Sequence, residues 1–260
     1  MREWNAQTYH RVSDPMFNLG LPVLARLPLA GTERVIDLGC GTGRLTELLL
    51  ERLPDGKVVA ADLSVNMIQT ARDYLAPRFG DRVAFVRVDA SALPFVESAD
   101  AVFSTATFHW VRDHDALVAS VHRALRAGGR LVAQCGGGPN LERLHRRADR
   151  VMDEPAFAPF FKEWQEIWLF EDAETTRARL ERTGFVDVQT WLESTPVVQP
   201  DASAYREYVA NIICRAHLAR LPDDGLKNEF LDRLTALAVT DEVPFELDYW
   251  RLNIVAMKQI

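Results

Sequence analysis

The chain has 260 residues, of which 48% are hydrophobic, and its formal net charge at pH 7 is −7. This length suits one substantial core with a small appended lobe rather than two independent enzymes. The acidic balance argues against a nucleic acid as substrate, because binding a phosphate backbone needs a concentrated basic surface. The densest basic run, residues 143–147, falls in an amphipathic helical stretch and is interpreted as a solvated face.

The N-terminal residues and the cysteines point to an intracellular protein. Residues 1–5 have no apolar signal core, and no stretch approaches the length of a membrane span. Cys40, Cys135 and Cys214 are widely spaced and form no Cys-x-x-Cys pair, so neither a disulfide framework nor a zinc site is indicated. We therefore expect a soluble, cytoplasmic chain that does not act on a membrane and holds no metal.

The first predicted strand ends in an acid and opens into three alternating glycines. Residues 35–44 read Val-Ile-Asp-Leu-Gly-Cys-Gly-Thr-Gly-Arg, and residues 45–50 continue with helical character. A side chain at Gly39, Gly41 or Gly43 would stand between the backbone and a ligand, or demand a φ value that L-residues resist. We expect a loop whose bare amides lie beside a helix N-terminus and cradle a cofactor.

Spacing and charge distinguish between two classes of cofactor for this loop. A dinucleotide fingerprint requires Gly-x-Gly-x-x-Gly, but Arg44 stands where the last glycine belongs. Asp37 lies just before the first glycine, and a carboxylate there would repel a phosphate. S-adenosylmethionine carries a sulfonium and an ammonium and has no phosphate. The run resembles motif I of the class I S-adenosylmethionine-dependent methyltransferases.

Two further acids end the next two predicted strands. The strand at residues 57–61 stops at Asp62, at about the twenty-residue distance of a ribose-binding acid. The strand at residues 83–88 ends at Asp89, where the family resemblance implies an acid facing the adenine amine. Acids at strand ends are also common turn or N-cap residues, but three in succession favour a cofactor site. The expected cofactor-binding residues are Asp37, Gly39, Gly41, Gly43, Asp62, Leu63, Met67, Asp89 and Ala90.

The remaining chain alternates predicted strands and helices. Strands are expected at 100–105, 130–135, 186–191 and 249–258, with helices at 113–126, closed by Gly128 and Gly129, and at 174–183. This alternation implies parallel pairing, with the ligand beyond the carboxyl ends of the strands. The resemblance spans nearly the whole chain and implies an α/β, Rossmann-like fold: a seven-stranded, mostly parallel sheet with helices on both faces and an antiparallel last strand.

An extra segment, residues 194–247, is not needed by a minimal methyltransferase core. It contains two predicted helices, at about 202–221 and 225–239. The expected organisation is therefore a core of residues 1–193 and 248–260, with an N-terminal lid segment, and a helical cap at 194–247. Tyr205 and Tyr208 lie at helical spacing, so they either pack the cap or line an acceptor pocket under it.

Aromatic residues indicate where an acceptor could bind. Trp4 and Tyr9 lie near a terminus and are predicted to fold over the active site. Together with Phe-His-Trp-Val at 108–111 and Asp-Tyr-Trp-Arg-Leu at 248–252, they resemble the small-molecule methyltransferases of the trans-aconitate methyltransferase type. That family usually has Gln where His109 stands, which leaves the acceptor open.

Methyl transfer from S-adenosylmethionine mainly requires that the nucleophile is aligned and that water is excluded. A carboxylate acceptor needs no base, whereas a phenol or enol could lose a proton to His109. His109 could equally contact the cofactor or only pack. Arg11 is a candidate counter-charge for an acidic acceptor. The expected acceptor-binding residues are Trp4, Tyr9, Arg11, Trp110, Tyr205 and Tyr208, and the expected catalytic residue is His109.

The sequence thus predicts an S-adenosylmethionine-dependent methyltransferase whose partner is a small molecule accepting a methyl group at a carboxylate or hydroxyl. Two alternatives stay open. An NAD-dependent oxidoreductase is disfavoured by Arg44 and by the absence of a Tyr-x-x-x-Lys dyad. A catalytically inactive cofactor-binding or regulatory protein of the same fold is not excluded.

Overall fold

The computed structural model describes residues 14–260, which form two compact units. The first, here called the sheet unit, comprises residues up to 138 together with 168–193 and 251–260. The second, the helical unit, comprises residues 139–167 and 194–250. Among the helices of the described part of the chain, none is long and apolar enough to cross a membrane.

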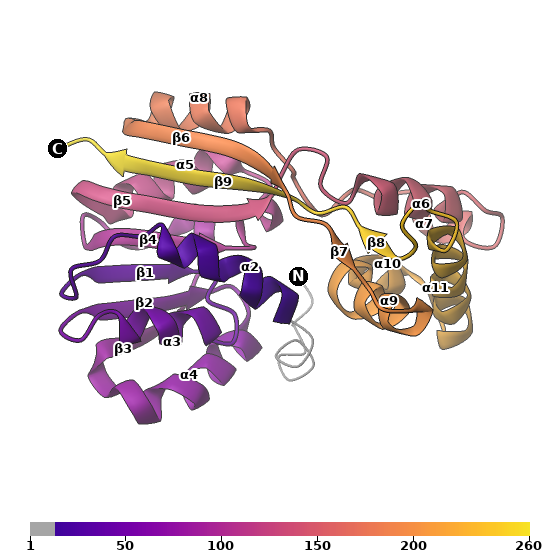
Figure 1. Ribbon diagram of the computed structural model, residues 1–260, viewed down its shortest axis with the longest axis horizontal. Helices are drawn as coiled ribbons and strands as arrows, with labels where there is room; N and C mark the ends of the chain where they lie inside the picture. Colours follow the sequence, from indigo (N-terminus) through magenta and orange to yellow (C-terminus); the bar gives the residue numbers. More distant parts are fainter. Residues whose placement is uncertain (1–13) are drawn as a thin grey trace. The chain divides into compact units, whose positions relative to one another are not determined.

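The sheet unit is built on seven strands in the order β3-β2-β1-β4-β5-β9-β6 (Figure 1). The strands are β1 (Arg34–Leu38), β2 (Lys57–Asp62), β3 (Val83–Arg87), β4 (Ala99–Thr105), β5 (Leu125–Gly136), β6 (Phe185–Ser194) and β9 (Trp250–Lys258). The pairs among β1 to β5 are parallel, and β9 runs antiparallel to β5. This confirms the predicted Rossmann-like sheet with its antiparallel last strand.

Helices cover both faces of the sheet because the buried strands are apolar on both sides. The helices are α2 (Asp14–Ala25), α3 (Arg44–Glu51) and α4 (Val65–Phe79) on one face, and α5 (His114–Ala124) and α8 (Ala173–Thr183) on the other (Figure 1). Leu49 and Leu75 belong to the first apolar layer, and Val121 and Leu180 to the second. Short 3₁₀ turns follow three elements: η1 (Gly80–Arg82), η2 (Ala90–Ala92) and η3 (Phe108–Trp110).

The helix predicted at 113–126 is wrong at its C-terminal end. It stops at Ala124, because the buried Leu125 already pairs with Ala99 as part of β5. Pairing with β4 is irregular until Arg130, and Gly128, with φ of 73°, lies in this stretch instead of capping the helix. Strand pairing and burial of Leu125 therefore outweigh the local glycine signal.

The helical unit contains the predicted extra segment, residues 194–247, together with residues 139–167 and 248–250. Its elements are α6 (Glu142–Met152), α7 (Ala158–Phe161), β7 (Val197–Val198), α9 (Ala202–Tyr208), the π-helical turn η4 (Val209–Ile213), α10 (Arg215–Arg220), α11 (Asp224–Ala238) and β8 (Glu246–Leu247). The helix expected at 202–221 is thus divided by a π-helical turn. Strands β7 and β8 pair as a small antiparallel ribbon.

Residues 139–167 belong to this unit rather than to the sheet unit, which differs from the expected boundary at residue 194. The reason is aromatic packing, since the rings of Phe157 and Phe161 lie 5.4 and 5.8 Å from that of Phe230 in α11. The basic run in α6 is not a wholly solvated face either. Arg147 is buried and ion-paired with Asp241.

Candidate functional site

The glycine loop between β1 and α3 adopts the backbone that its sequence predicts. Gly39, Gly41 and Gly43 have φ values of 80°, 54° and 90°, which favour glycine. A Cβ atom on Gly39 would lie 1.8 Å from Oγ1 of Thr107, so this glycine allows close packing against the loop after β4. A Cβ atom on Gly41 would meet nothing within 4 Å, so this glycine borders open space that a ligand can use.

The loop amides are not bare, contrary to the prediction. The amides of Gly39 and Cys40 donate to the carbonyl oxygen of Ala61, at 2.7 and 3.0 Å. The amide of Gly41 donates to Oδ2 of Asp62 at 3.0 Å. These bonds form because the loop crosses the end of β2, where buried N–H groups need partners. The loop therefore offers a ligand its shape, and these three amides already have partners within the chain.

Asp37 is the buried acid of this loop, at 2% exposure. The hydroxyl of Thr46 donates to its Oδ2 at 2.6 Å. Burial raises the pKa of Asp37 to about 7, and the charge of Asp62 adds to this effect. A cation bound beside Asp37 would restore its ionised form, whereas a phosphate would not. The charge of the site thus suits a ligand with a sulfonium and an ammonium.

A small pocket joins Asp37 to the glycine loop. Its lining is Met16, Phe17, Asp37, Gly39, Cys40, Gly41, Thr42, Arg44, Leu45, Thr105 and Ala106. Arg44 therefore does more than break the dinucleotide pattern, because it brings a cation to the pocket, where it pairs with Asp14 and lies over the ring of Phe17. Sequence reasoning missed this role, along with those of Met16 and Thr105.

Asp62 and Asp89 each shape a chain turn at a strand end. Asp62 accepts the amides of Ser64, at 2.9 Å, and of Gly41. Asp89 is exposed and caps η2, where its Oδ1 accepts the amide and the hydroxyl of Ser91 at 2.9 and 2.7 Å. Each carboxylate has further lone pairs that can accept hydrogen bonds from a ligand. The cofactor contacts of Asp62 and Asp89 stay predictions.

The three apolar residues predicted beside these acids differ in burial. Leu63 is exposed, directly after β2. Met67 is buried in the first turn of α4, and its amide donates to the Ser64 hydroxyl at 3.3 Å. Ala90 is buried at the start of η2. Leu63 is therefore the one of the three that presents apolar surface beside Asp62.

His109 lies in η3, after β4, and its proton position follows from one hydrogen bond. The amide of Gly136 donates to its Nδ1 at 3.1 Å, so Nδ1 is unprotonated and the neutral ring carries its hydrogen on Nε2. Burial lowers the pKa of His109 to about 3, and the charges of Arg251 and His114 contribute. Neither ring nitrogen is placed to accept a proton, so the geometry does not suit a general base.

His114 fixes the loop that carries His109. Its Nε2 lies 3.0 Å from the carbonyl oxygen of Phe108, and its Nδ1 lies 3.0 Å from Oε2 of Glu171. The ring of His114 thus bridges the Phe108 carbonyl and the Glu171 carboxylate. Burial opposes ionisation of Glu171, but hydrogen bonds from His114 and Arg179 hold its pKa below the usual value.

An aromatic wall surrounds His109. The ring of Trp110 lies 5.5 Å from that of His109 and 5.5 Å from that of Trp168, and the ring of Phe170 lies 5.7 Å from His109. The amide of Leu169 donates to the carbonyl oxygen of His109 at 2.9 Å, which fastens residues 168–171 to this loop. Trp110 was predicted, whereas Trp168 and Phe170 come from a part of the chain that carries no motif.

Arg251 is the main residue that sequence reasoning missed. It is 3% exposed and faces Gly136 across the pair formed by β9 and β5. Its Nη2 lies 3.6 Å from Sδ of Met16, which lines the cofactor pocket. The available signal was a charged residue inside the apolar closing strand, within a run used only for its family resemblance.

The other predicted acceptor residues belong to the helical unit or fall outside the described residues. Tyr205 is fully buried in the helical unit, where its hydroxyl accepts from Nη1 of Arg147 at 3.3 Å, and burial raises its pKa to about 12. The Tyr208 hydroxyl lies 3.1 Å from that of Tyr249. Their acceptor roles stay predictions. So do those of Trp4, Tyr9 and Arg11, which lie outside the described residues.

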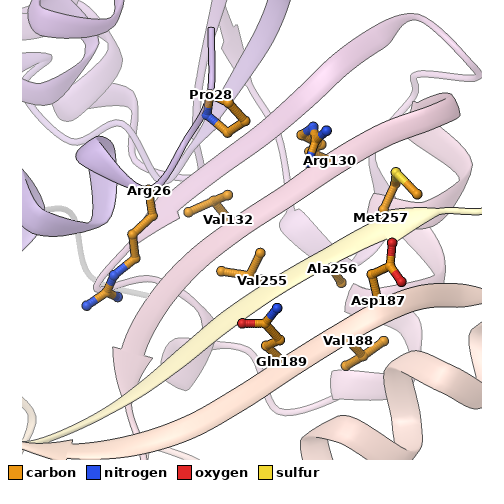
Figure 2. Close-up of a pocket in the computed structure, with 10 residues that line it drawn as sticks. All are labelled: Arg26, Pro28, Arg130, Val132, Asp187, Val188, Gln189, Val255, Ala256 and Met257. Atoms are coloured by element: carbon orange, nitrogen blue, oxygen red, sulfur yellow. The ribbon is translucent and has the colours of Figure 1, made fainter.

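A larger hollow, of about 490 Å³, lies at the other end of the strands (Figure 2). Arg130 of β5 lines it, opposite Met257 near the end of β9, whereas the site described above lies at Gly136 and Arg251. Figure 2 shows Arg130, Asp187 and Gln189 around a floor that includes Val132 and Val255. This hollow is therefore separate from the glycine loop.

Comparisons with known proteins place the chain among methyltransferases. Residues 35–129 match the family model described as a methyltransferase domain. The trans-aconitate 2-methyltransferase of Azoarcus sp. (strain BH72) is 31% identical over 231 residues, which cover 86% of this chain and 85% of that relative. The trans-aconitate 2-methyltransferase of Methylobacterium nodulans is 37% identical over 159 residues, 61% of this chain and 59% of the relative.

A solved structure shows the same fold. It is the Haemonchus contortus phosphoethanolamine N-methyltransferase 2 in complex with phosphomonomethylethanolamine and S-adenosylhomocysteine. The TM-score is 0.62 at 21% sequence identity, and the match covers 98% of this chain and 57% of that chain. At this identity the likeness establishes the fold, and the acceptor must be argued from the site.

Proposed function

Because the chain belongs to the trans-aconitate methyltransferase family of S-adenosylmethionine-dependent methyltransferases, we propose that it methylates a carboxylate of a small organic acid. The single observation that carries this proposal is the pairing of the pocket at Asp37 with the neutral His109. The pocket suits a cationic methyl donor, and His109 is not placed to remove a proton. A carboxylate is an acceptor that needs no proton removed near neutral pH.

The residues around the glycine loop fit S-adenosylmethionine. When bound, this cofactor supplies a methyl group activated by its attachment to a positively charged sulfur. Asp37 offers a carboxylate to the positive charges, and Arg44 offers a guanidinium to the carboxylate of the methionine portion. Gly41 leaves room beside them, and Asp62 is the predicted partner of the ribose hydroxyls.

The residues around His109 suit the acceptor. The rings of Trp110, Trp168 and Phe170 pack together beside His109 and offer an apolar surface that would keep water away from a bound acceptor. Methylation of a carboxylate releases no proton, so the chain only has to hold and orient the acid. The coarser expectation of a small-molecule acceptor is thereby narrowed to an acid, in keeping with the trans-aconitate named for the relatives.

Neither alternative considered from the sequence gains support. An NAD-dependent oxidoreductase would place a pyrophosphate against the carboxylate of Asp37 in the pocket that also holds Arg44. A cofactor-binding protein without catalysis would bind S-adenosylmethionine and transfer nothing, which makes it separable by experiment.

The test is transfer of a radiolabelled methyl group from S-adenosylmethionine to trans-aconitate by the full-length chain. We expect label in a methyl ester that alkali hydrolyses, and inhibition by S-adenosylhomocysteine. Failure to methylate any member of a panel of small organic acids, with cofactor binding intact by calorimetry, would contradict the proposal and favour the inactive alternative. Saturable binding of NAD without a response to S-adenosylmethionine would overturn the cofactor assignment.

A further inference from the structure

The guanidinium that lines the cofactor pocket is already held by an acid of the chain itself. Nη1 of Arg44 lies 2.9 Å from Oδ1 of Asp14, and Cζ of Arg44 lies 4.2 Å from the centroid of the Phe17 ring. Asp14 and Phe17 belong to the first turn of α2, which lies on the same face of the sheet as α3 (Figure 1). Phe17 and Arg44 both line the pocket. An anion that binds Arg44 from within this pocket must therefore compete with Asp14.

The ion pair between Asp14 and Arg44 is loosely held. Nη1 of Arg44 is buried and makes no hydrogen bond within the described part of the chain, so its contact with Asp14 is a charge contact without a directed bond. The Asp14 side chain is 70% exposed, against 24% for Arg44, so water can take over this carboxylate at little cost. A ligand carboxylate could instead meet the guanidinium with two parallel hydrogen bonds. It would also lie at the positive end of α3, whose N-cap Gly43 supplies no side-chain cap.

The helix that carries Asp14 has a weak point in its middle. Gly20 and Pro22 both lie inside α2. Proline has no N–H for the helix ladder and its ring presses on the carbonyl four residues earlier, and glycine is a poor helix former. Beyond this point Val23 is buried in the apolar layer, whereas before it Phe17 is only half-buried. Residues 14–19, here called the flap, can therefore turn while the rest of α2 stays packed.

We propose that Asp14 occupies the place of the cofactor's own carboxylate: S-adenosylmethionine enters by taking Arg44 from Asp14, and the flap turns about Gly20 and Pro22 as this ion pair opens. The exchange replaces one noncovalent contact with another, and the released Asp14 carboxylate passes into water. The inference goes beyond the proposed function, because it concerns cofactor entry and holds for any acceptor. It also makes Arg44 and Asp14 the residues that select a methyl donor carrying a carboxylate.

The experiment compares S-adenosylmethionine with its decarboxylated form, which keeps the sulfonium and the ammonium. Calorimetry on the full-length chain gives Kd for each, and the wild type should bind S-adenosylmethionine more tightly. In Arg44→Gln, we expect Kd for S-adenosylmethionine to rise about 10- to 100-fold, because a charged hydrogen-bond partner is lost. Kd for the decarboxylated form should change little. An equal loss for both ligands would overturn the proposal.

Asp14→Asn tests the competition directly, because it keeps the size of the side chain and removes the competing charge. Kd for S-adenosylmethionine should fall about 2- to 5-fold, the range of a partly exposed ion pair, and Kd for the decarboxylated form should stay the same. The matched control is Asp115→Asn. Asp115 also lies in the first turn of its helix, is 69% exposed and pairs with Arg179 at 2.9 Å. This control should leave both Kd values unchanged.

The flap is tested by the rate at which S-adenosylmethionine associates with the immobilised chain, measured by surface plasmon resonance. Pro22→Ala restores an N–H to α2 and should slow association severalfold. Pro77→Ala makes the same change at an exposed proline inside α4 and should leave the rate unchanged.

Three results separate the possible failures. An Asp14→Asn variant whose Kd for S-adenosylmethionine is that of the wild type, or falls equally for both ligands, overturns the exchange. A Pro22→Ala variant with the wild-type association rate overturns the turning flap. If Arg44→Gln fails to fold, Asp14→Asn decides alone. A chain that shows the expected binding pattern but methylates no organic acid supports the exchange and contradicts only the proposed function.

Discussion

The cofactor loop and the acceptor loop occupy neighbouring strand ends but are built in different ways. The amides of Gly39, Cys40 and Gly41 in the cofactor loop, residues 37–43, donate to Ala61 and Asp62, about twenty residues along the chain. The acceptor loop, η3, is held by Gly136, by residues 169–171 and by His114. A local site can be recognised from a motif, whereas an assembled site needs the fold. The two loops can therefore be perturbed separately.

The largest loss of stability should come from a substitution at Gly39, which packs against Thr107 beside the acceptor loop. In Gly39→Ala, the added methyl would overlap Thr107 in a backbone with φ of 80°. We expect the free energy of unfolding to fall by about 3 kcal/mol or more and cofactor binding to be lost. The matched variant Gly41→Ala adds its methyl in open space and should stay folded, with weaker cofactor binding. Thermal melting and calorimetry measure both, and equal stability of the two variants would contradict this account.

A change confined to the cofactor loop should separate binding from acceptor chemistry. Asp62→Ala removes the acceptor of the Gly41 and Ser64 amides and the predicted partner of the ribose hydroxyls. The expected cost is about 2–3 kcal/mol of cofactor affinity, or about a 30- to 100-fold rise in Kd. The pKa of His109 should not move. A folded variant with wild-type Kd would remove Asp62 from the site.

A change confined to the acceptor loop should lower the rate of methyl transfer and leave cofactor binding unchanged. His114→Gln can donate to the Phe108 carbonyl or to Glu171 but cannot bridge the two as the imidazole ring does, so η3 should lose its fixed position. We expect kcat to fall about tenfold with the cofactor Kd unchanged. His122→Gln, at the other end of α5, is the control and should leave kcat as in the wild type. A loss of cofactor affinity equal to the loss of kcat would show that the loops are not independent.

The smallest effect concerns the pH dependence of the cofactor loop. The pKa of Asp37 is raised from 3.8 to about 7 in the folded chain, so its contribution to stability is present below pH 3.8 and is lost as pH rises through 7. A cationic cofactor favours the ionised carboxylate, so its binding should release a proton and strengthen by about a few-fold from pH 6 to pH 8. Calorimetry in buffers of different ionisation enthalpy measures this release. Asp37→Asn should abolish it, and an unchanged pH dependence in that variant would assign the effect to another group.

The sequence by itself determined the features that depend on neighbouring residues. Alternating glycines require positive φ values, and all three have them. The seven strands follow from apolar runs, and each acid lies at the strand end where it was expected. These features are legible because each depends on steric and burial rules that act within a few residues.

The tertiary structure decided what depends on contacts between distant segments. Gly128 was expected to cap a helix, but pairing of Leu125 with β4 placed it in a strand. His109 has the residue type of a general base, yet an amide 27 positions away sets its proton on Nε2. Arg251 stands out locally only as a charge in an apolar strand, and its position opposite Gly136 follows from the antiparallel register of β9. Proton positions and buried charges are set by whatever the fold brings within hydrogen-bond reach, and sequence spacing does not encode that distance.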